Sequence, residues 1–211
     1  MEIYLIRHTT PKIEKGVCYG FSDLELADSY EEEVSLLSKK VIQNLKKQYY
    51  KNAKEDKKQE LLIYTSPLQR CSILAKDLKT NLQNYFHPQI KRNKNLKEMN
   101  FGEWELKKWN EINEDELKQW TDNFVTESTP NGESFEVLNK RVIDFWQKNI
   151  KTEKEKGKIA LIVCHAGVIR SILCYVLQIP LQKAFSVSID YGSISKLKVF
   201  ETHTQVEFLN G

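Results

Sequence analysis

Cysteine is scarce in this sequence, and the spacing of the few cysteines excludes two kinds of site. The 211 residues include four cysteines, and no two of them have the paired spacing of a zinc site or of a disulfide framework. They are Cys18, Cys71, Cys164 and Cys174. We therefore expect four reduced thiols and a cytoplasmic protein.

An excess of charge of either sign is also lacking. The chain has 32 basic and 29 acidic residues, and no basic stretch is interleaved with aromatic residues. This balance argues against nucleic acid as a partner. The lysine-rich run at 46–58 is expected to be a solvated helix end and loop.

No stretch is typical of a signal peptide or of a membrane helix. The chain enters a predicted strand directly after Met1, without a charged region followed by an apolar one. Residues 159–177 are apolar, but His165, Gly167 and Arg170 lie in the middle of them, where ionisable groups are costly in lipid. A buried strand, a tight turn and a buried helix explain this stretch better, so we expect no membrane partner.

What the sequence does contain is an alternation of short apolar runs and amphipathic segments. The apolar runs predict strands at 2–7, 61–65, 89–92 and 158–164. The helical periods predict helices at 31–49, 66–84, 133–151 and 168–177. Closing strands are expected at 184–189 and 193–200, and a third at 205–209.

This alternation predicts the fold class α/β. We expect one domain over residues 1–211, built as a three-layer α/β/α sandwich whose central sheet is mostly parallel and has helices on both faces. Residues 104–130 begin with a stretch rich in Trp, Glu and Lys, which predicts a short helical, lid-like insertion.

A histidine stands where each of two apolar runs ends. His8 follows the strand at 2–7, directly after Arg7, and His165 follows the strand at 158–164. In open α/β sheets, functional groups collect in the crevice at the carboxyl ends of the strands. One such histidine would more often be structural, but two in matching context predict a single site assembled from distant parts of the chain.

Arg70 and Glu98 are further candidates for this site. Ser66 and Pro67 predict a helix start, with serine as the cap and proline in the first helical position. Arg70 then lies in the first turn, where the helix dipole favours an anion. An arginine there either pairs with a carboxylate or holds a phosphate.

Together these residue types predict phosphoryl transfer. Guanidinium groups can neutralise the phosphoryl oxygens bidentately, a neutral histidine can act as the nucleophile, and a carboxyl group can protonate the leaving oxygen. The sequence has no His/Asp cluster with ligand spacing and no Gly-rich Walker loop. We expect no metal and no cofactor.

Five blocks of the sequence, in this order, carry a resemblance to a known family. They are Arg7-His8-Thr9, the segments 66–70, 96–104 and 130–134, and Cys164-His165-Ala166-Gly167. Each block alone is weak, but all five in order resemble the histidine phosphatase superfamily, the phosphoglycerate-mutase-like proteins. The resemblance implies that His8 is the nucleophile that becomes phosphorylated. It also implies that Arg7, Arg70 and His165 hold the phosphoryl group and that Glu98 donates the proton.

Two positions depart from the family pattern. Thr9 replaces the glycine that usually follows the histidine, and Glu14 stands where many members have asparagine. These departures concern secondary phosphate contacts, among which we keep Thr9 as a candidate.

The family contains mutases and phosphatases, and the length of one segment separates them. Pro130 follows Glu98 by only 32 positions, a segment shorter than the corresponding insertion of the glycolytic mutases. A short insertion implies a more open site that water can enter, which favours a phosphatase. The loop at 16–23, its continuation to residue 30 and the Arg-His-Thr variant are similar to the family's α-ribazole phosphatase subgroup. This implies hydrolysis of α-ribazole 5′-phosphate in cobalamin biosynthesis.

Aromatic residues are candidates for contacts with the leaving group. Tyr19, Phe21 and Trp104 are predicted to flank a flat leaving group, together with Trp109 and Trp120. Packing of the insertion onto the sheet explains Trp104 and Trp109 at least as well. The expected partner is a small-molecule phosphomonoester, and the sequence leaves a homodimer open.

Other functions stay open at this point. Within the enzymes, the alternatives are a sugar-phosphate phosphatase of broad specificity and a phosphoglycerate mutase. From a different class, a catalytically silent scaffold would bind a phosphorylated partner, although all five core site residues are present. A nucleotide-binding module would need a Gly-rich phosphate loop, which the sequence lacks.

Overall fold

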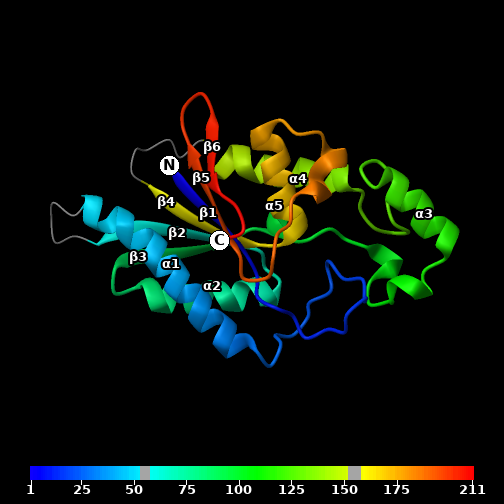
Figure 1. Cartoon of the computed structure of the whole chain (residues 1–211), viewed down its shortest axis with the longest axis horizontal. Coiled ribbons are helices and arrows are strands. Elements are labelled where there is room, and N and C mark those ends of the chain that lie inside the picture. Colours follow the sequence, from blue (N-terminus) through cyan, green and yellow to red (C-terminus); the bar gives the residue numbers. More distant parts are fainter. Residues whose placement is uncertain (53–57, 152–157) are drawn as a thin grey trace.

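A central sheet of six strands organises the molecule (Figure 1). The computed structural model describes residues 1–52, 58–151 and 158–211, so residues 53–57 of the lysine-rich run lie outside the described residues. The strand order is β3-β2-β4-β1-β5-β6. The strands are β1 (Glu2–Arg7), β2 (Gln59–Thr65), β3 (Phe86–Arg92), β4 (Ile159–Cys164), β5 (Ile194–Val199) and β6 (Thr204–Phe208).

The sheet is parallel over its first four strands. β1 and β2 pair in parallel with β4, and β3 pairs in parallel with β2, whereas β5 and β6 are antiparallel to their neighbours. The predicted mostly parallel α/β sheet is therefore confirmed. β3 begins three residues before the predicted 89–92 and contains Pro88, which is tolerated because β3 lies at the edge of the sheet.

Helices cover both faces of the sheet, as predicted. α1 (Tyr30–Asn52) and α2 (Gln69–Leu82) lie on one face, and α4 (Phe135–Asn149) and α5 (Ala166–Leu177) lie on the other (Figure 1). In β1, Ile3 and Leu5 pack into the core beneath α4 and α5, whereas Tyr4 and Ile6 pack into the core beneath α1 and α2. A strand buried on both faces needs this continuous apolar run, because successive side chains point to opposite sides.

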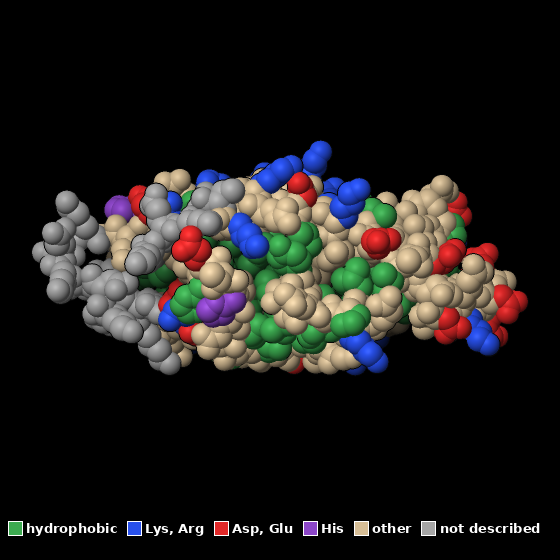
Figure 2. All heavy atoms as spheres, turned by 90° about the horizontal axis from the view of Figure 1, so that it is seen from above, with side chains coloured by type: hydrophobic (Ala, Val, Ile, Leu, Met, Phe, Trp, Pro, Cys, Tyr) green, Lys and Arg blue, Asp and Glu red, His purple; other side chains and the backbone are tan. Residues whose placement is uncertain are grey.

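The segment between β3 and α4 holds four short helices. They are η1 (Lys94–Leu96), η2 (Gly102–Trp104), η3 (Trp109–Glu111) and α3 (Glu114–Asn123). Trp104 and Ile112 form a small core of their own with Cys18 from the loop after β1. α3 stands away from the sheet (Figure 1), and acidic side chains gather at that end of the molecule (Figure 2).

Two expectations about secondary structure are wrong. Residues 184–189 do not form a strand, since η4 (Leu181–Ser186) occupies the first half of that range, and Ala184 is the only buried residue of η4. α2 begins at Gln69 with Leu68 as its N-cap, so neither Ser66 nor Pro67 starts the helix. The Ser66 hydroxyl instead lies 2.9 Å from Nε2 of His165.

Among the described residues, no helix combines the length and the apolar character needed to cross a bilayer.

Candidate active site

The two strand-end histidines lie side by side. β1 and β4 are neighbours, and the backbone N–H of His8 donates to the carbonyl of Cys164 at 3.0 Å. The imidazole centroids of His8 and His165 are 5.1 Å apart, in an edge-to-face arrangement. Both side chains are buried. Parallel pairing thus places both histidines at the carboxyl edge of the sheet.

One hydrogen bond fixes the tautomer of His8. Its Nδ1 lies 2.7 Å from the carbonyl oxygen of Thr9. A carbonyl can only accept, so Nδ1 carries the proton and Nε2 of the neutral ring keeps its lone pair. Burial, and then the charges of Arg70 and Arg7, lower the pKa of His8 well below its ordinary value. His8 is therefore neutral at pH 7 and has a free nucleophilic nitrogen.

His165 is a second neutral imidazole. Burial lowers its pKa well below the ordinary value, with further contributions from Arg70 and from His8. Its Nε2 lies 2.9 Å from the hydroxyl of Ser66 and 3.5 Å from the sulfur of Cys71. Ser66 thus lies beside the candidate site, although its place before Pro67 predicts a helix cap.

The two arginines beside these histidines have donors without partners. Nη1 of Arg7 donates to the carbonyl of Ile189 at 2.6 Å, and its guanidinium carbon lies 3.7 Å from the centroid of the Tyr191 ring. Both Nε atoms, of Arg7 and of the fully buried Arg70, are buried without a hydrogen-bond partner, and so is Oγ1 of Thr9. Buried donors without partners are costly. An anion beside His8 would relieve that cost.

Arg70 is held by the loop that contains Gly20 and Ser22. Its Nη1 donates to the carbonyl of Ser22 at 2.7 Å, and its Nη2 donates to the carbonyl of Gly20 at 2.6 Å. A side chain at Gly20 would have to overlap the backbone of the segment after Glu98, because a Cβ there would lie 1.8 Å from the carbonyl oxygen of Met99. This position therefore requires glycine.

The loop itself is anchored by Glu105, which sequence reasoning missed. The Glu105 carboxylate accepts from the backbone N–H groups of Gly20, Phe21 and Ser22 at 2.8–3.0 Å, and from the Ser22 hydroxyl at 2.5 Å. Burial opposes the charge, but these hydrogen bonds outweigh it and lower the pKa of Glu105. Its sequence signal is only its place directly after Trp104.

Glu98 faces the space next to the histidines. Oε1 accepts from the backbone N–H of Met99, and Oε2 accepts from that of Gly167, both at 3.0 Å. Gly167 lies in the first turn of α5, and a Cβ there would lie 2.3 Å from Oε1 of Glu98. The glycine therefore allows the carboxyl group to approach the helix start closely.

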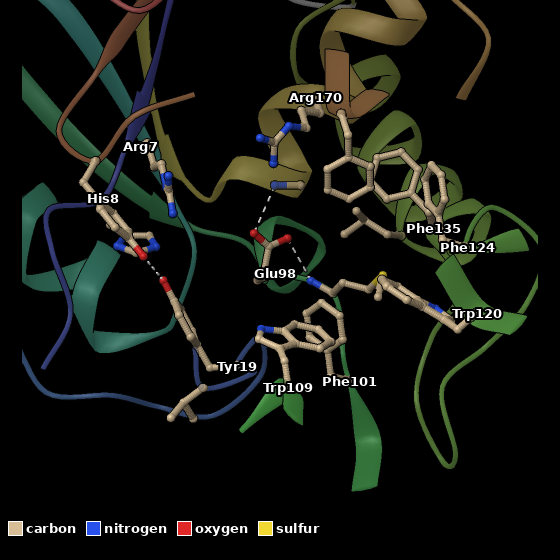
Figure 3. A pocket seen from close by; sticks show the side chains of 16 residues that line it. Arg7, His8, Tyr19, Glu98, Phe101, Trp109, Trp120, Phe124, Phe135 and Arg170 are labelled. Carbon is tan, nitrogen blue, oxygen red and sulfur yellow. Dashed lines mark hydrogen bonds between the residues drawn. The ribbon is translucent and has the colours of Figure 1, made fainter. Parts of the chain in front are cut away.

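These residues border a cavity of about 240 Å³ (Figure 3). Arg7 and His8 lie at one side of it, and Glu98 lies between them and an aromatic wall. The hydroxyl groups of Tyr19 and Tyr191, from distant loops, form a hydrogen bond at its edge. The wall consists of Phe101, Trp109, Trp120, Phe124, Phe135 and Phe185.

The structure separates the predicted leaving-group contacts. Tyr19, Trp109 and Trp120 line the cavity. In the described part of the chain, the lining includes neither Phe21 nor Trp104. Trp104 is buried in the small core of the insertion, and the Phe21 ring has the Lys97 amino group 4.7 Å from its centroid.

Two lining residues with polar side chains, Tyr191 and Arg170, are not among the predicted site residues. Tyr191 follows η4 in an irregular segment, where no periodicity points to a site. In the sequence, Arg170 indicates only that residues 159–177 do not form a membrane helix. The sequence feature that could have identified Arg170 is its spacing, since it follows Gly167 by three residues on α5 and so shares a helix face with it.

Within the described residues, no group of three or more His, Cys, Asp or Glu side chains is placed to hold a metal ion.

Comparisons with known proteins agree on one family. The family model "Histidine phosphatase superfamily (branch 1)" matches residues 3–211. The candidate phosphoserine phosphatase 2 of Hydrogenobacter thermophilus is 27% identical, over 99% of this chain and 94% of that protein. A 2,3-bisphosphoglycerate-dependent phosphoglycerate mutase of Cytophaga hutchinsonii is 30% identical, over 57% of this chain and 64% of the mutase. The crystal structure of the α-ribazole phosphatase of Shigella flexneri superposes with a TM-score of 0.80 at 21% identity, covering 100% of this chain and 96% of the other.

Proposed function

The chain belongs to the histidine phosphatase superfamily (branch 1), and from this premise we propose that it hydrolyses phosphomonoesters through a phosphohistidine at His8. One observation carries the proposal. Nδ1 of His8 is engaged with the Thr9 carbonyl, so the lone pair of Nε2 is free, in a buried place beside two arginines. A neutral, oriented imidazole next to cationic groups is what in-line attack on a phosphoryl group requires.

In the first step, Nε2 of His8 attacks phosphorus as the bond from phosphorus to the ester oxygen breaks. Arg7 and Arg70, with His165 and Thr9, hold the phosphoryl oxygens and offset the charge that develops on them. Glu98, in its protonated form, gives its proton to the leaving oxygen, so that an alcohol departs. The phosphoryl group stays on His8.

In the second step, water attacks the phosphohistidine. Glu98, now a carboxylate, takes a proton from that water, and the bond between phosphorus and Nε2 breaks. Inorganic phosphate leaves and His8 returns to its neutral form. The same carboxyl group thus acts as acid and then as base.

The lengths over which the relatives match this chain support hydrolysis, rather than transfer of the phosphoryl group to another position of the substrate as in a mutase. The candidate phosphoserine phosphatase matches 99% of this chain, whereas the phosphoglycerate mutase matches 57%. The insertion between Glu98 and Pro130 is short, as expected for a site that water enters. We propose that this insertion, residues 104–130 of a single domain, acts as a lid over a small phosphomonoester in a cytoplasmic enzyme that needs no metal.

For the substrate, α-ribazole 5′-phosphate is the first candidate. The sequence resembles that subgroup, the matched Shigella structure is an α-ribazole phosphatase, and the aromatic wall suits a flat ring. O-Phosphoserine is a second candidate, because a relative that matches 99% of this chain bears the name of a phosphoserine phosphatase. The two candidate substrates carry the same phosphate and differ in the leaving group, which would lie in the cavity.

A phosphate-release assay with EDTA present tests the proposal. The substrates are α-ribazole 5′-phosphate, O-phosphoserine, sugar phosphates and 3-phosphoglycerate. We expect stoichiometric phosphate release without a bisphosphate cofactor, and we expect it to vanish in His8→Ala. The matched control is His87→Ala, an exposed histidine on β3, which should keep full activity.

Two results would contradict the proposal. Hydrolysis retained in a folded His8→Ala variant would remove His8 as the nucleophile. No release from any ester, with tight phosphate binding preserved, would favour the silent scaffold.

A further inference from the structure

Arg170 places a second positive charge in the cavity, in addition to that of Arg7. It follows Gly167 by three residues on α5, and both residues line the cavity with Glu98. Figure 3 shows its guanidinium over the Glu98 carboxylate, between Arg7 and the aromatic wall. Arg7 and Arg70 already serve the phosphoryl side, so Arg170 is available to another part of the ligand.

The side chain is held from one side only. Its Nε donates to the carbonyl of Val187 at 3.0 Å, and its guanidinium carbon lies 5.0 Å from the centroid of the Phe185 ring. Among the residues that the structure describes, no hydrogen bond or ion pair occupies its two terminal amino groups. The contacts with Val187 and Phe185 therefore orient a fork whose open end faces the cavity.

Glu98 lies near this arginine but does not form an ion pair with it in the described structure. Both oxygens of Glu98 already accept from backbone N–H groups. Burial lowers the pKa of Arg170, the nearby charge of Arg7 lowers it further, and the charge of Glu98 raises it without outweighing burial. A guanidinium in such a place is stabilised by an anion that pairs with both amino groups.

The wall beside Arg170 is apolar. The Phe185 ring centroid lies 5.0 Å from that of Phe124 and 6.1 Å from that of Phe135. A ligand that reaches Arg170 therefore contacts phenyl rings along its length and meets a cation at its end. This combination suits an apolar or aromatic body that carries an acidic group.

We propose that the leaving group of the substrate carries a carboxylate, which Arg170 binds bidentately while the body of the leaving group packs against the phenylalanine wall. The inference rests on the proposed hydrolysis. It argues against α-ribazole 5′-phosphate as the substrate, because that ester offers a flat ring but no acidic group besides its phosphate. It favours an ester such as O-phosphoserine, whose leaving group carries a carboxylate. Arg170 is thereby a specificity-determining residue.

Two matched esters test this inference. 4-(Carboxymethyl)phenyl phosphate and 4-ethylphenyl phosphate have leaving phenols of similar acidity and size, and they differ in the carboxylate. We expect kcat/KM to be about tenfold to about a hundredfold higher for the carboxylate ester, as a hydrogen-bonded charge pair implies. Arg170→Gln should remove most of this ratio, and Arg170→Lys should keep part of it.

An exposed arginine supplies the control. Arg92→Gln, at the end of β3 and outside the cavity, should leave the ratio as in the unaltered protein. The ethyl ester reports on folding and chemistry in every variant, because it needs no contact with the charge of Arg170.

Three results would overturn the inference. One is equal kcat/KM for the two esters. Another is a loss in Arg170→Gln that is the same for both, which would mean that Arg170 supports only the structure around Val187. The third is equal calorimetric affinity of His8→Ala for the two esters. Because that variant binds without turning over, failure of the proposed hydrolysis and failure of the carboxylate contact remain distinguishable.

Discussion

Burial decides the charge of the two histidines at the centre of the site. Both His8 and His165 lose their solvent contact, and both lie beside cationic arginines, so each effect lowers the pKa. The residues that we propose to hold a phosphate thus also keep the proposed nucleophile, His8, unprotonated. One arrangement of charges meets two requirements of the proposed reaction.

The contribution of Glu98 to kcat is expected to be larger for esters whose leaving oxygen must be protonated before it departs. Glu98→Gln should lower kcat for alkyl phosphates by about a hundredfold or more, because protonation of a poor leaving oxygen is lost. p-Nitrophenyl phosphate, whose phenolate leaves without a proton, should be affected far less. Steady-state kinetics on the two ester classes measure the difference.

A glutamine at this position would also turn an amide N–H₂ toward a backbone N–H, since both carboxylate oxygens accept such donors. Glu98→Ala, which has no such conflict, should show the same bias between leaving groups. Equal losses on both ester classes in the two variants would argue against Glu98 as the general acid.

The positions of single residues could be predicted where a strand ends. His8 and His165 were predicted to share one site, and the structure brings their rings together. Aromatic residues of the insertion could not be assigned, because an irregular segment has no period that shows which side of it is buried. Trp104 enters a core and Trp109 enters the cavity wall, although they are only five residues apart.

At the scale of elements, the loop around Gly20 connects two charged groups. Glu105 holds its N–H groups, while Arg70 holds its carbonyl groups. The carboxylate of Glu105 therefore fixes the loop, and the fixed carbonyl groups of the loop orient the guanidinium of Arg70. We infer that Glu105 is a positioning residue for Arg70.

Glu105→Gln should therefore affect both folding and phosphate binding. An amide cannot accept all of these N–H donors, so the free energy of unfolding should fall by about 1–3 kcal/mol. The affinity for inorganic phosphate should fall about tenfold, because Arg70 loses its fixed orientation. Urea unfolding and calorimetry measure the two effects.

The control is Glu103→Gln, because Glu103 is exposed and its carboxylate accepts from the side chain of Asn131. It should change neither quantity appreciably. A loss of stability in Glu105→Gln with unchanged phosphate affinity would show that the loop does not position Arg70.

Most elements could be predicted because their apolar patterns are long and regular. The exceptions have local causes. Ser66 and Pro67 have the residue types of a helix start, but the Ser66 hydroxyl is near His165 and the helix begins later. Residues 184–189 are apolar enough for a strand, but Pro180 precedes a 3-10 helix there, and its Phe185 joins the cavity wall.

At the scale of the whole molecule, the buried histidines link stability to pH. Their pKa values are lowered in the folded protein, whereas in the unfolded chain they titrate near about 6.5. Below that pH the unfolded chain binds protons that the folded protein does not. Acid therefore favours the unfolded state.

The free energy of unfolding should fall between about pH 7.5 and about pH 5.5, by about 1.4 kcal/mol for each of the two histidines. His8→Gln should remove one of these contributions and so show a shallower dependence. Urea titrations at both pH values measure it. His87→Gln, an exposed histidine, should keep the full dependence, and an unchanged slope in His8→Gln would mean that His8 is protonated in the folded protein.

The pairing of β1 with β4 sets when the site can form. It joins residue 2 to residue 159 and residue 7 to residue 164, so the proposed nucleophile, His8, is synthesised early and its neighbour His165 is synthesised late. Contacts between such distant parts of a chain form slowly, because a long loop must close first. A nascent chain that ends before β4 carries His8 without the site around it. Phosphatase activity would therefore appear only when the chain has been made through β4 and has folded, and it could serve as a readout of completed folding.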